Sequence, residues 1–163
     1  MPELQPLSAQ HEGAVLEFEL DNRAYFAGFV PDRGDEYFER FAERHRFLLS
    51  EQAAGVAAFY VLVDDDGSVL GRFNLEISGD GVAVLGYRVA ERVAGRGVAT
   101  ATVRSLCELA AERHGVHTVR AATTAANVGS QRVLLKAGFV PDGPADPAEI
   151  GGQEGSWFRR STP

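Results

Sequence analysis

Hydrophobic residues follow a helical spacing in the first third of the chain, after a short apolar segment at residues 4–7 that predicts a strand. Residues 9–22 carry a loosely helical pattern, and a second helix is expected to begin after Asp35, a suitable N-cap. The apolar face of this second helix consists of Phe38, Phe41, His45 and either Leu48 or Leu49. The chain therefore starts with one short strand and two helices.

Strand patterns come next. Residues 56–63 are a continuous apolar run that ends at an Asp-Asp-Asp-Gly turn, and residues 69–77 alternate between apolar and polar side chains. In this second segment the apolar residues Phe73, Leu75 and Ile77 are expected on one face, and the polar residues Arg72, Asn74 and Glu76 on the other. A Ser-Gly-Asp-Gly turn leads into a third strand over residues 82–89. The three segments predict an antiparallel meander.

The spacing then changes to a helical period, and helices and strands alternate to the end of the chain. The expected elements are a helix at 97–114, a strand at 116–124, a helix at 127–137, a strand from Phe139, and a last strand around Trp157 and Phe158. Gly115 and Gly138 suit the C-terminal ends of the two helices. This order predicts the α/β class, as one domain over residues 1–163 in which a mixed sheet has helices on both faces.

Composition narrows the kinds of partner. Hydrophobic residues make up 45% of the 163 residues and charged residues 24%, an ordinary balance for a globular domain. The formal net charge of −7 repels nucleic acids and anionic membrane surfaces. We therefore expect no nucleic-acid partner and no membrane partner, and a cationic ligand such as an amine is favoured.

Neither the cysteine nor the histidines predict a metal site or a nucleophile. Cys107, the single cysteine, lies on the apolar stripe of a predicted helix and is expected to be a core residue. The four histidines lack the cysteine or carboxylate neighbours of a zinc site, so no metal is expected: His11, His45, His114 and His117. Residues 1–10 lack a signal-peptide pattern, and no apolar run approaches about 18 residues. A cytoplasmic protein is expected.

A strand, a glycine-bearing loop and a helix follow one another between residues 85 and 100. The first turn of a helix has free N–H groups and a partial positive charge, which suits a phosphate group. Gly95 and Gly97 remove side chains where an anion must approach the backbone, and they permit a positive φ. Arg92 and Arg96 would add charge-assisted hydrogen bonds. The pattern predicts a phosphate site, with a tight turn that binds nothing as the alternative.

Two other phosphate-binding motifs do not fit this loop. A Walker A loop requires Lys and then Ser or Thr after its last glycine, but Val98 and Ala99 stand there. A dinucleotide fingerprint requires a third glycine where Thr100 stands, and an acidic residue at the end of the next strand. Residues 116–124 contain no acidic residue.

A second segment supports the phosphate site. Residues 127–139 read Asn-Val-Gly-Ser-Gln-Arg-Val-Leu-Leu-Lys-Ala-Gly-Phe and follow a predicted strand. Together the two segments resemble the GNAT superfamily of acyl-CoA N-acyltransferases, whose signature Arg/Gln-x-x-Gly-x-Gly/Ala is matched by Arg92, Gly95 and Gly97. The second segment, and Leu-Gly-Tyr at residues 85–87, are similar to the Rim-type branch, which includes ribosomal-protein N-terminal acetyltransferases.

The resemblance, which covers residues 69–139 well, implies a GNAT fold with a mostly antiparallel central sheet that splays at an acetyl-CoA cleft. It implies acetyl-CoA as co-substrate, with the pantetheine arm paired to backbone groups near Val89. The pyrophosphate would bind to the loop residues Val93, Gly95, Arg96, Gly97, Val98, Ala99 and Thr100. Asn127 would hydrogen-bond the pantetheine chain, and Ser130 would protonate the leaving thiolate. The alternative roles are helix N-cap for Asn127 and first-turn capping for Ser130.

The amine that attacks the thioester must first lose a proton, so the resemblance also implies a general base. Glu76 is favoured because it lies on the polar face of a central strand. Glu17, Glu19 and Asp21 are the other candidates, and a surface position is the alternative for each of the four carboxylates. A chain of water molecules could also take the proton.

The function that follows is acetyl-CoA-dependent N-acetylation of a primary amine, either a protein N-terminus or a small molecule. Two other functions are alternatives: a non-catalytic acyl-CoA-binding sensor with the same fold, and a protein that binds a different phosphate ligand. The oligomeric state is left open between monomer and homodimer.

Overall fold

The computed structural model describes residues 1–163, which form two compact units. Unit 1 contains Met1–Asn74 and Tyr87–Val93, and unit 2 contains Leu75–Gly86 and Ala94–Pro163. The expectation of one domain over residues 1–163 stays a prediction. No helix combines the length and the apolar composition that crossing a membrane requires.

The strands form one mixed sheet. They are β1 (Glu3–Pro6), β2 (Ala57–Val63), β3 (Val69–Ile77), β4 (Val82–Val89), β5 (Thr118–Thr124), β6 (Val140–Pro144) and β7 (Gly155–Ser161). Their order in the seven-stranded sheet is β1-β2-β3-β4-β5-β7-β6. The neighbours β2, β3 and β4 are joined by turns of a few residues, which only antiparallel strands allow. The expected meander is therefore confirmed.

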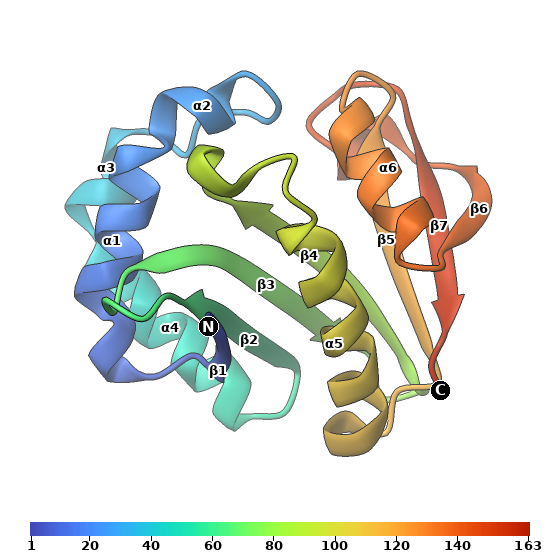
Figure 1. Ribbon diagram of the computed structural model, residues 1–163, viewed down its shortest axis with the longest axis horizontal. Helices are drawn as coiled ribbons and strands as arrows, with labels where there is room; N and C mark the ends of the chain where they lie inside the picture. Colours follow the sequence, from blue (N-terminus) through green and yellow to red (C-terminus); the bar gives the residue numbers. More distant parts are fainter. The chain divides into compact units, whose positions relative to one another are not determined.

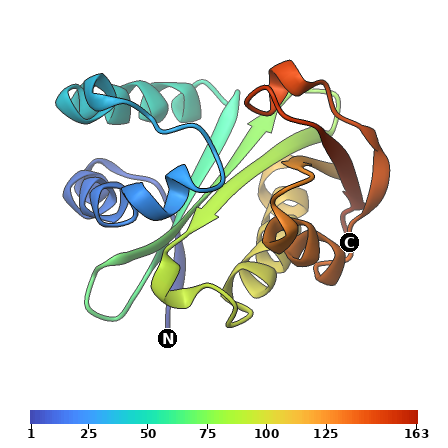
Figure 2. The same ribbon diagram turned by 90° about the horizontal axis from the view of Figure 1, so that it is seen from above.

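Unit 1 carries the N-terminal helices. They are η1 (Ala9–His11), α1 (Glu12–Asp21), α2 (Arg23–Ala27), α3 (Asp35–Glu39), α4 (Phe41–Ala53) and η2 (Glu91–Val93). Figure 2 shows α1 and α4, in blue and teal, together on one side of the strands of this unit. Their apolar faces and the strands form a common core that includes Val15, Phe18, Phe41, Leu48 and Val61. Of the apolar face predicted for the second helix, Phe41, His45 and Leu48 are buried, and Phe38 is half-buried.

The second predicted helix differs from expectation at its start and in its continuity. Gly34, with φ 87°, is the N-cap, and Asp35 is the first helical residue. The Asp35 carboxylate pairs with Arg23 at 2.8 Å and does not cap the backbone. The helix also breaks at Arg40, whose backbone is not helical, into α3 and α4.

Unit 2 carries two long helices and a short one: α5 (Val98–His114), α6 (Val128–Lys136) and η3 (Pro147–Glu149). In Figure 1, α6 lies in front of β5, and α5 packs beside α6. The buried stripe of α5 includes Val103, Leu106 and Cys107, which confirms the core position of the cysteine. Gly115, with φ 65°, ends α5 in the left-handed conformation that a glycine C-cap provides.

Strands β4 and β5 pair only at their beginnings. They run parallel with Val82 opposite Thr118 and Val84 opposite Arg120, and their pairing ends there. β5 meanwhile pairs with β7 over its whole length, from Thr118 to Thr124. The two parallel strands therefore separate after their first residues, which agrees with the splayed sheet that was expected.

The last strand in the chain is not at the edge of the sheet. β7 lies between β5 and β6, so β6 is the edge strand. Pro141 and Pro144 belong to β6, and the register shifts between them. Proline has no N–H to donate and is confined to edges and bulges, which explains why β6 occupies the outer position.

Candidate active site

The loop before α5 has the backbone that its glycines predict. Gly95 and Gly97 have φ values of 75° and 78°, in the region that L side chains rarely adopt. A Cβ atom built at either position would meet no heavy atom within 4 Å. The loop is therefore open on the side of both glycines, and a ligand can approach its backbone there.

The N-terminus of α5 has unused backbone donors. The bond from the Ala101 N–H to the Gly97 oxygen, at 3.0 Å, is the first of the regular helical pattern. The N–H groups of Val98, Ala99 and Thr100 precede that bond and have no helical acceptor. Gly97 offers no side chain as a cap, and the first turn contains no acidic residue. These donors and the helix dipole make this end of α5 suited to an anion.

The other residues predicted for the phosphate site lie in different environments. Arg96 in the loop is exposed, whereas Arg92 in η2 donates to the Ser68 hydroxyl at 2.9 Å and lies 3.7 Å from the Asp64 carboxylate. Val89 and Val93 are half-buried in unit 1. Arg92 would have to leave these partners, in whole or in part, to contact a phosphate.

The N-terminus of α6 is capped by Asn127. Its Oδ1 accepts a hydrogen bond from the Ser130 backbone N–H at 3.2 Å, so the capping role is confirmed. This bond uses only the amide oxygen, and the NH2 group remains a donor for another partner. Gln131 ties the same turn to β5 by donating to the Thr124 oxygen at 3.1 Å. The half-buried Ser130 is therefore held in a well-defined first turn.

The four candidate bases divide into exposed and buried groups. Glu76 in β3 is exposed, as are Glu17 and Asp21 in α1. Glu19 is only 1% exposed, so its side chain is a core residue and not a surface charge. Arg72 is also buried, at 6% exposure, which corrects its expected place on an outward polar face of β3.

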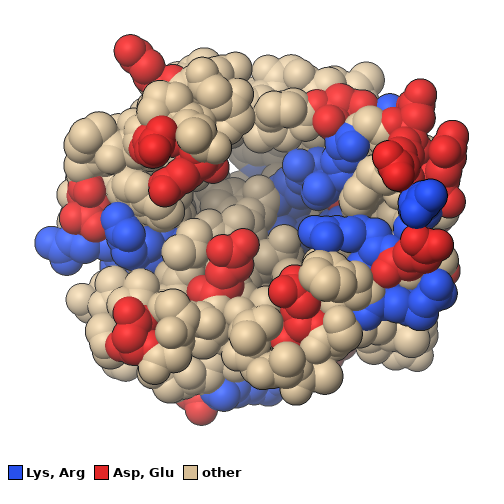
Figure 3. All heavy atoms as spheres, turned by 180° about the vertical axis from the view of Figure 1, so that it is seen from behind, with Lys and Arg blue, Asp and Glu red and all other residues tan.

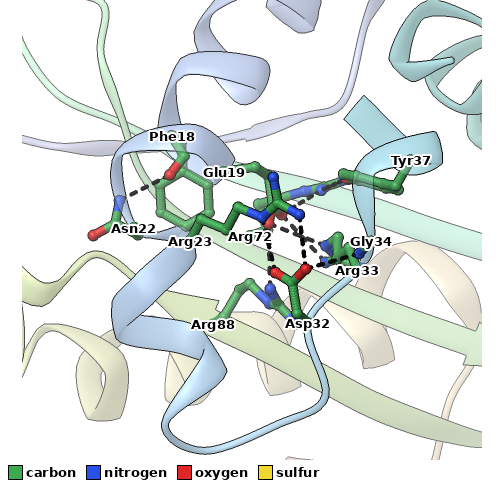
Figure 4. Close-up of polar contacts among 10 residues, drawn as sticks. All are labelled: Phe18, Glu19, Asn22, Arg23, Asp32, Arg33, Gly34, Tyr37, Arg72 and Arg88. Carbon is green, nitrogen blue, oxygen red and sulfur yellow. Dashed lines mark hydrogen bonds and ion pairs between the residues drawn. The ribbon is translucent and has the colours of Figure 1, made fainter. Parts of the chain in front are cut away.

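Glu19 and Arg72 belong to an arginine cluster, defined here as Glu19 with Arg33, Arg72 and Arg88 (Figure 4). Arg33 donates to both Glu19 oxygens, at 3.0 and 3.2 Å. Arg72 donates to Oε2 at 2.7 Å, and Arg88 donates to Oε1 at 3.2 Å. Ion pairing explains why α1 and β3 can bury these charges at all.

The cluster determines the protonation state of Glu19. Burial alone would raise the pKa of this carboxyl, but the hydrogen bonds and positive charge of Arg33, with the charges of Arg72 and Arg88, lower it below its ordinary value. Glu19 therefore stays ionised and is a weak base. Of the four carboxylates, it is the one least suited to accept a proton from an amine.

The cluster was missed in the sequence because no local pattern marks it. The Arg72–Glu19 bond joins residues 53 positions apart, and the Arg88–Glu19 bond joins residues 69 positions apart. One weak signal existed: Arg72 interrupts a strand in which Leu70, Phe73 and Leu75 are all apolar. A charge in such a strand requires a partner, but the strand does not say which one.

No group of three or more His, Cys, Asp and Glu side chains is placed to hold a metal ion. The Nδ1 atom of His11 accepts the Ser8 N–H, and its Nε2 atom lies 2.9 Å from the Gln5 Oε1 atom. The His45 Nε2 atom lies 2.9 Å from the Ser8 carbonyl oxygen. Burial raises the pKa of the Cys107 thiol, which favours its unreactive form.

Comparison with known proteins gives a consistent result. A family model described as "Acetyltransferase (GNAT) domain" matches residues 3–140. A probable N-acetyltransferase from Bacillus subtilis, YjcK, is 27% identical over 146 residues, covering 86% of this chain and 81% of that protein.

Solved structures agree in fold. The ribosomal-protein-S5-alanine acetyltransferase from Vibrio fischeri superimposes with a TM-score of 0.89 at 19% identity, over 99% of this chain and 93% of that one. RimL, a ribosomal L7/L12 α-N-protein acetyltransferase in complex with coenzyme A, has a TM-score of 0.87 at 19% identity, over 99% and 94% of the two chains. The mixed sheet with its flanking helices is thus the fold of these enzymes.

Proposed function

Because the chain belongs to the GNAT acetyltransferase family, and is therefore an acyltransferase that uses acetyl-CoA, we propose that it binds acetyl-CoA at the N-terminus of α5. The observation that carries this proposal is the combination of two open, positive-φ glycines with three backbone N–H groups that lack helical acceptors. The pyrophosphate would accept hydrogen bonds from Val98, Ala99 and Thr100, as phosphates do at helix N-termini. Arg96 would add a charge-assisted bond from the loop.

The α6 N-terminus is proposed to bind the pantetheine end. The Asn127 cap leaves its NH2 group as a donor for a pantetheine carbonyl. Ser130, in the same turn, is proposed as the acid that protonates the leaving thiolate. Support for this role comes from its place beside Asn127 in unit 2, which also contains the α5 N-terminus.

The reaction is proposed to be direct attack of a neutral primary amine on the thioester carbonyl. Since an alkylammonium has a pKa of about 10.4, less than about 0.1% of the amine is neutral at pH 7. Glu76, which is exposed and carries no arginine partner of the kind Glu19 has, is the proposed base, acting directly or through water. The carbonyl carbon becomes tetrahedral and the C–S bond breaks. Ser130 gives its proton to the CoA thiolate as it leaves, and takes up the proton that the amine nitrogen loses after its attack.

The acceptor is a primary amine. Relatives of this fold include a spermidine N-acetyltransferase and enzymes that modify ribosomal proteins, so a protein N-terminus and a small-molecule amine are both proposed acceptor classes. We place the reaction in the cytoplasm, where the single buried cysteine is in keeping with a reducing environment. A homodimer remains a proposal, which light scattering with and without acetyl-CoA would decide.

Two measurements test the proposal. Acetyl-CoA should raise the melting temperature by mass action, and NADH and ATP at the same concentration should raise it much less. Free-thiol release from acetyl-CoA should then appear with at least one member of a panel of amines and peptides. Equal shifts for all three nucleotides would contradict the acetyl-CoA site, and binding without thiol release for any amine would instead indicate a sensor.

A further inference from the structure

The arginine cluster holds more positive charge than its carboxylate neutralises. Three guanidinium groups surround the single Glu19 carboxylate. A carboxylate offers about four acceptor positions, and the four hydrogen bonds from the arginines use about that number. The three guanidinium groups together have about fifteen N–H donors, so most of them must bond elsewhere.

Two carboxylates close to Arg33 in the sequence are engaged by a different arginine, Arg23. Arg23 binds Asp32 through two hydrogen bonds, at 3.0 and 2.8 Å, and Asp35 through a third, at 2.8 Å. Figure 4 shows the bonds between Asp32 and Arg23. The positive charge of Arg33, Arg72 and Arg88 thus remains in excess over Glu19.

Solvent reaches two of the three arginines. The side chains of Arg88 and Arg33 are 20% and 31% exposed, whereas that of Arg72 is 7% exposed. Burial lowers the pKa of Arg88, and the charges of Arg33 and Arg72 lower it further. An additional anion would relieve this repulsion.

Aromatic rings fix the positions of the arginines before any ligand arrives. The Arg88 guanidinium lies 4.6 Å from the centre of the Phe26 ring, and that of Arg33 lies 4.8 Å from the centre of the Tyr37 ring. The Tyr37 hydroxyl accepts a hydrogen bond from Arg72 at 3.0 Å, so its own proton remains a donor. A preorganised set of donors binds an anion at a lower entropic cost than mobile surface side chains do.

Basic side chains are not spread evenly over this acidic chain. Figure 3 shows that lysine and arginine side chains gather on one part of the face drawn there. Arg88 also directly precedes Val89, near which the resemblance to GNAT enzymes implies that the pantetheine arm of acetyl-CoA lies. A group bound at Arg88 would therefore lie near the end of β4, on the strand beside which the acyl donor is expected.

We infer that Arg33, Arg72 and Arg88 form an oxyanion-binding site for a carboxylate or phosphate group carried by the acceptor amine. This inference rests on the proposed function and narrows the acceptor to amines that also bear a negative charge. The planar fork of a guanidinium group matches both oxyanions, and Arg88 and Arg33 are the arginines that a ligand can reach. Arg72 holds Glu19, and Glu19 holds the other two in place.

Matched acceptor pairs test the site through turnover. The α-amides of glutamate and glutamine differ only in a carboxylate, and O-phosphoethanolamine and ethanolamine differ only in a phosphate. Thiol release at saturating acetyl-CoA should give kcat/KM at least about tenfold higher for the charged member of at least one pair, mainly through KM. Arg88→Met should bring that ratio close to one, and Arg88→Lys, which keeps the charge but loses the fork, should give an intermediate ratio.

Two controls separate recognition from folding. Arg40→Met removes an exposed arginine of unit 1 that pairs only with Glu36 and Glu43 on the surface, and it should leave the ratio unchanged. Thermal denaturation of each variant shows whether it is folded. Arg33→Gln, which removes the most exposed member of the cluster, provides a second variant if Arg88→Met is unstable.

Calorimetry tests the same site without turnover. The N-acetylated α-amide of glutamate and inorganic phosphate have no amine to react, and one of them should bind wild type at least about tenfold more tightly than Arg88→Met. Thiol release with no preference for either charged acceptor would overturn the inference and leave the proposed function standing. Absence of thiol release with any amine would defeat the proposed function instead, and Arg88-dependent anion binding would then still support the oxyanion site.

Discussion

Glu19 forms ion pairs with three arginines from different parts of unit 1. It joins α1 to β3 through Arg72 and to β4 through Arg88, and it also binds Arg33 from the segment between α2 and α3. Removing one member of a buried ion pair leaves an uncompensated charge, which costs more than the pair contributes. The residue is therefore a structural anchor that holds three arginines.

Glu19→Gln should lower the free energy of unfolding by about 3 kcal/mol at pH 7, because three guanidinium groups would lose their shared counter-charge. Urea denaturation measures this loss. Glu17→Gln, an exposed change on the same helix, is the matched control and should change stability by less than about 0.5 kcal/mol. Similar losses for both variants would show that the cluster contributes little to stability.

Substitution of Ser130 tests whether its hydroxyl, in the first turn of α6, takes part in acyl transfer. If it donates to the developing thiolate, Ser130→Ala should lower kcat and kcat/KM together by about tenfold to a hundredfold, with acetyl-CoA affinity nearly unchanged. Ser105→Ala, at an exposed position in α5, should leave the kinetics unchanged.

A purely structural role for Ser130 has a different signature. Loss of a first-turn contact should cost about 1 kcal/mol of stability and leave kcat intact. Steady-state kinetics and a denaturation curve on the same variant decide between the two roles. A full kcat in a destabilised protein would mean that the thiolate leaves without help from this serine.

The helix α5 has a glycine in the left-handed conformation at each end, and the two glycines serve different purposes. Gly97, with φ 78°, begins the helix beside the proposed phosphate site, and Gly115, with φ 65°, ends it. Neither has a heavy atom within 4 Å of a built Cβ. A substitution at either position therefore meets the same kind of backbone strain, about 1–2 kcal/mol, and no steric clash.

Gly97→Glu should weaken acetyl-CoA binding at least about tenfold, because a side chain and a negative charge would meet the pyrophosphate. Gly115→Glu is the matched control: it introduces similar strain into the same helix and should leave the affinity unchanged. Calorimetric titration of both variants with acetyl-CoA measures the difference. Unchanged affinity in Gly97→Glu would place the phosphates elsewhere.

The stability of the protein should fall in acid in two pH ranges, and one buried group contributes to the fall in each. Burial, with a contribution from His45, lowers the pKa of His11 below 6.5, and the Nδ1 atom of His11 accepts the Ser8 N–H at 3.0 Å. Below pH 6.5 the unfolded chain gains a proton that the folded chain resists, so stability decreases. Glu19 has a folded pKa below 4.5, so the stability it contributes above 4.5 is lost as the pH falls through that lower value.

Urea denaturation at pH 7.5, 5.5 and 4 measures the decrease in both ranges. His11→Gln should flatten the decrease between pH 7.5 and 5.5, and Glu19→Gln should flatten the decrease below pH 5.5. A stability that is constant from pH 7.5 to 4 would contradict both assignments.

Local chemistry was sufficient for most of the helices and strands and for the backbone of the proposed phosphate loop. The glycines at positions 95 and 97 were expected to permit a positive φ, which both adopt, and the apolar stripe of α5 was expected to be buried, as it is. Asn127 was expected to be able to cap α6, and it does. Each of these properties depends on residues within about one or two helical turns, so periodicity and capping rules predict them.

Only the tertiary structure decided which charges are buried and which are on the surface. Glu19 and Glu17 are two positions apart in one helix, yet the first is a core residue and the second is exposed. Arg72 occupies a polar position of an alternating strand, yet it is buried against a carboxylate 53 positions away. Charges carry no periodic signal of their own, and the stability of a buried charge depends on partners that long-range folding brings to it.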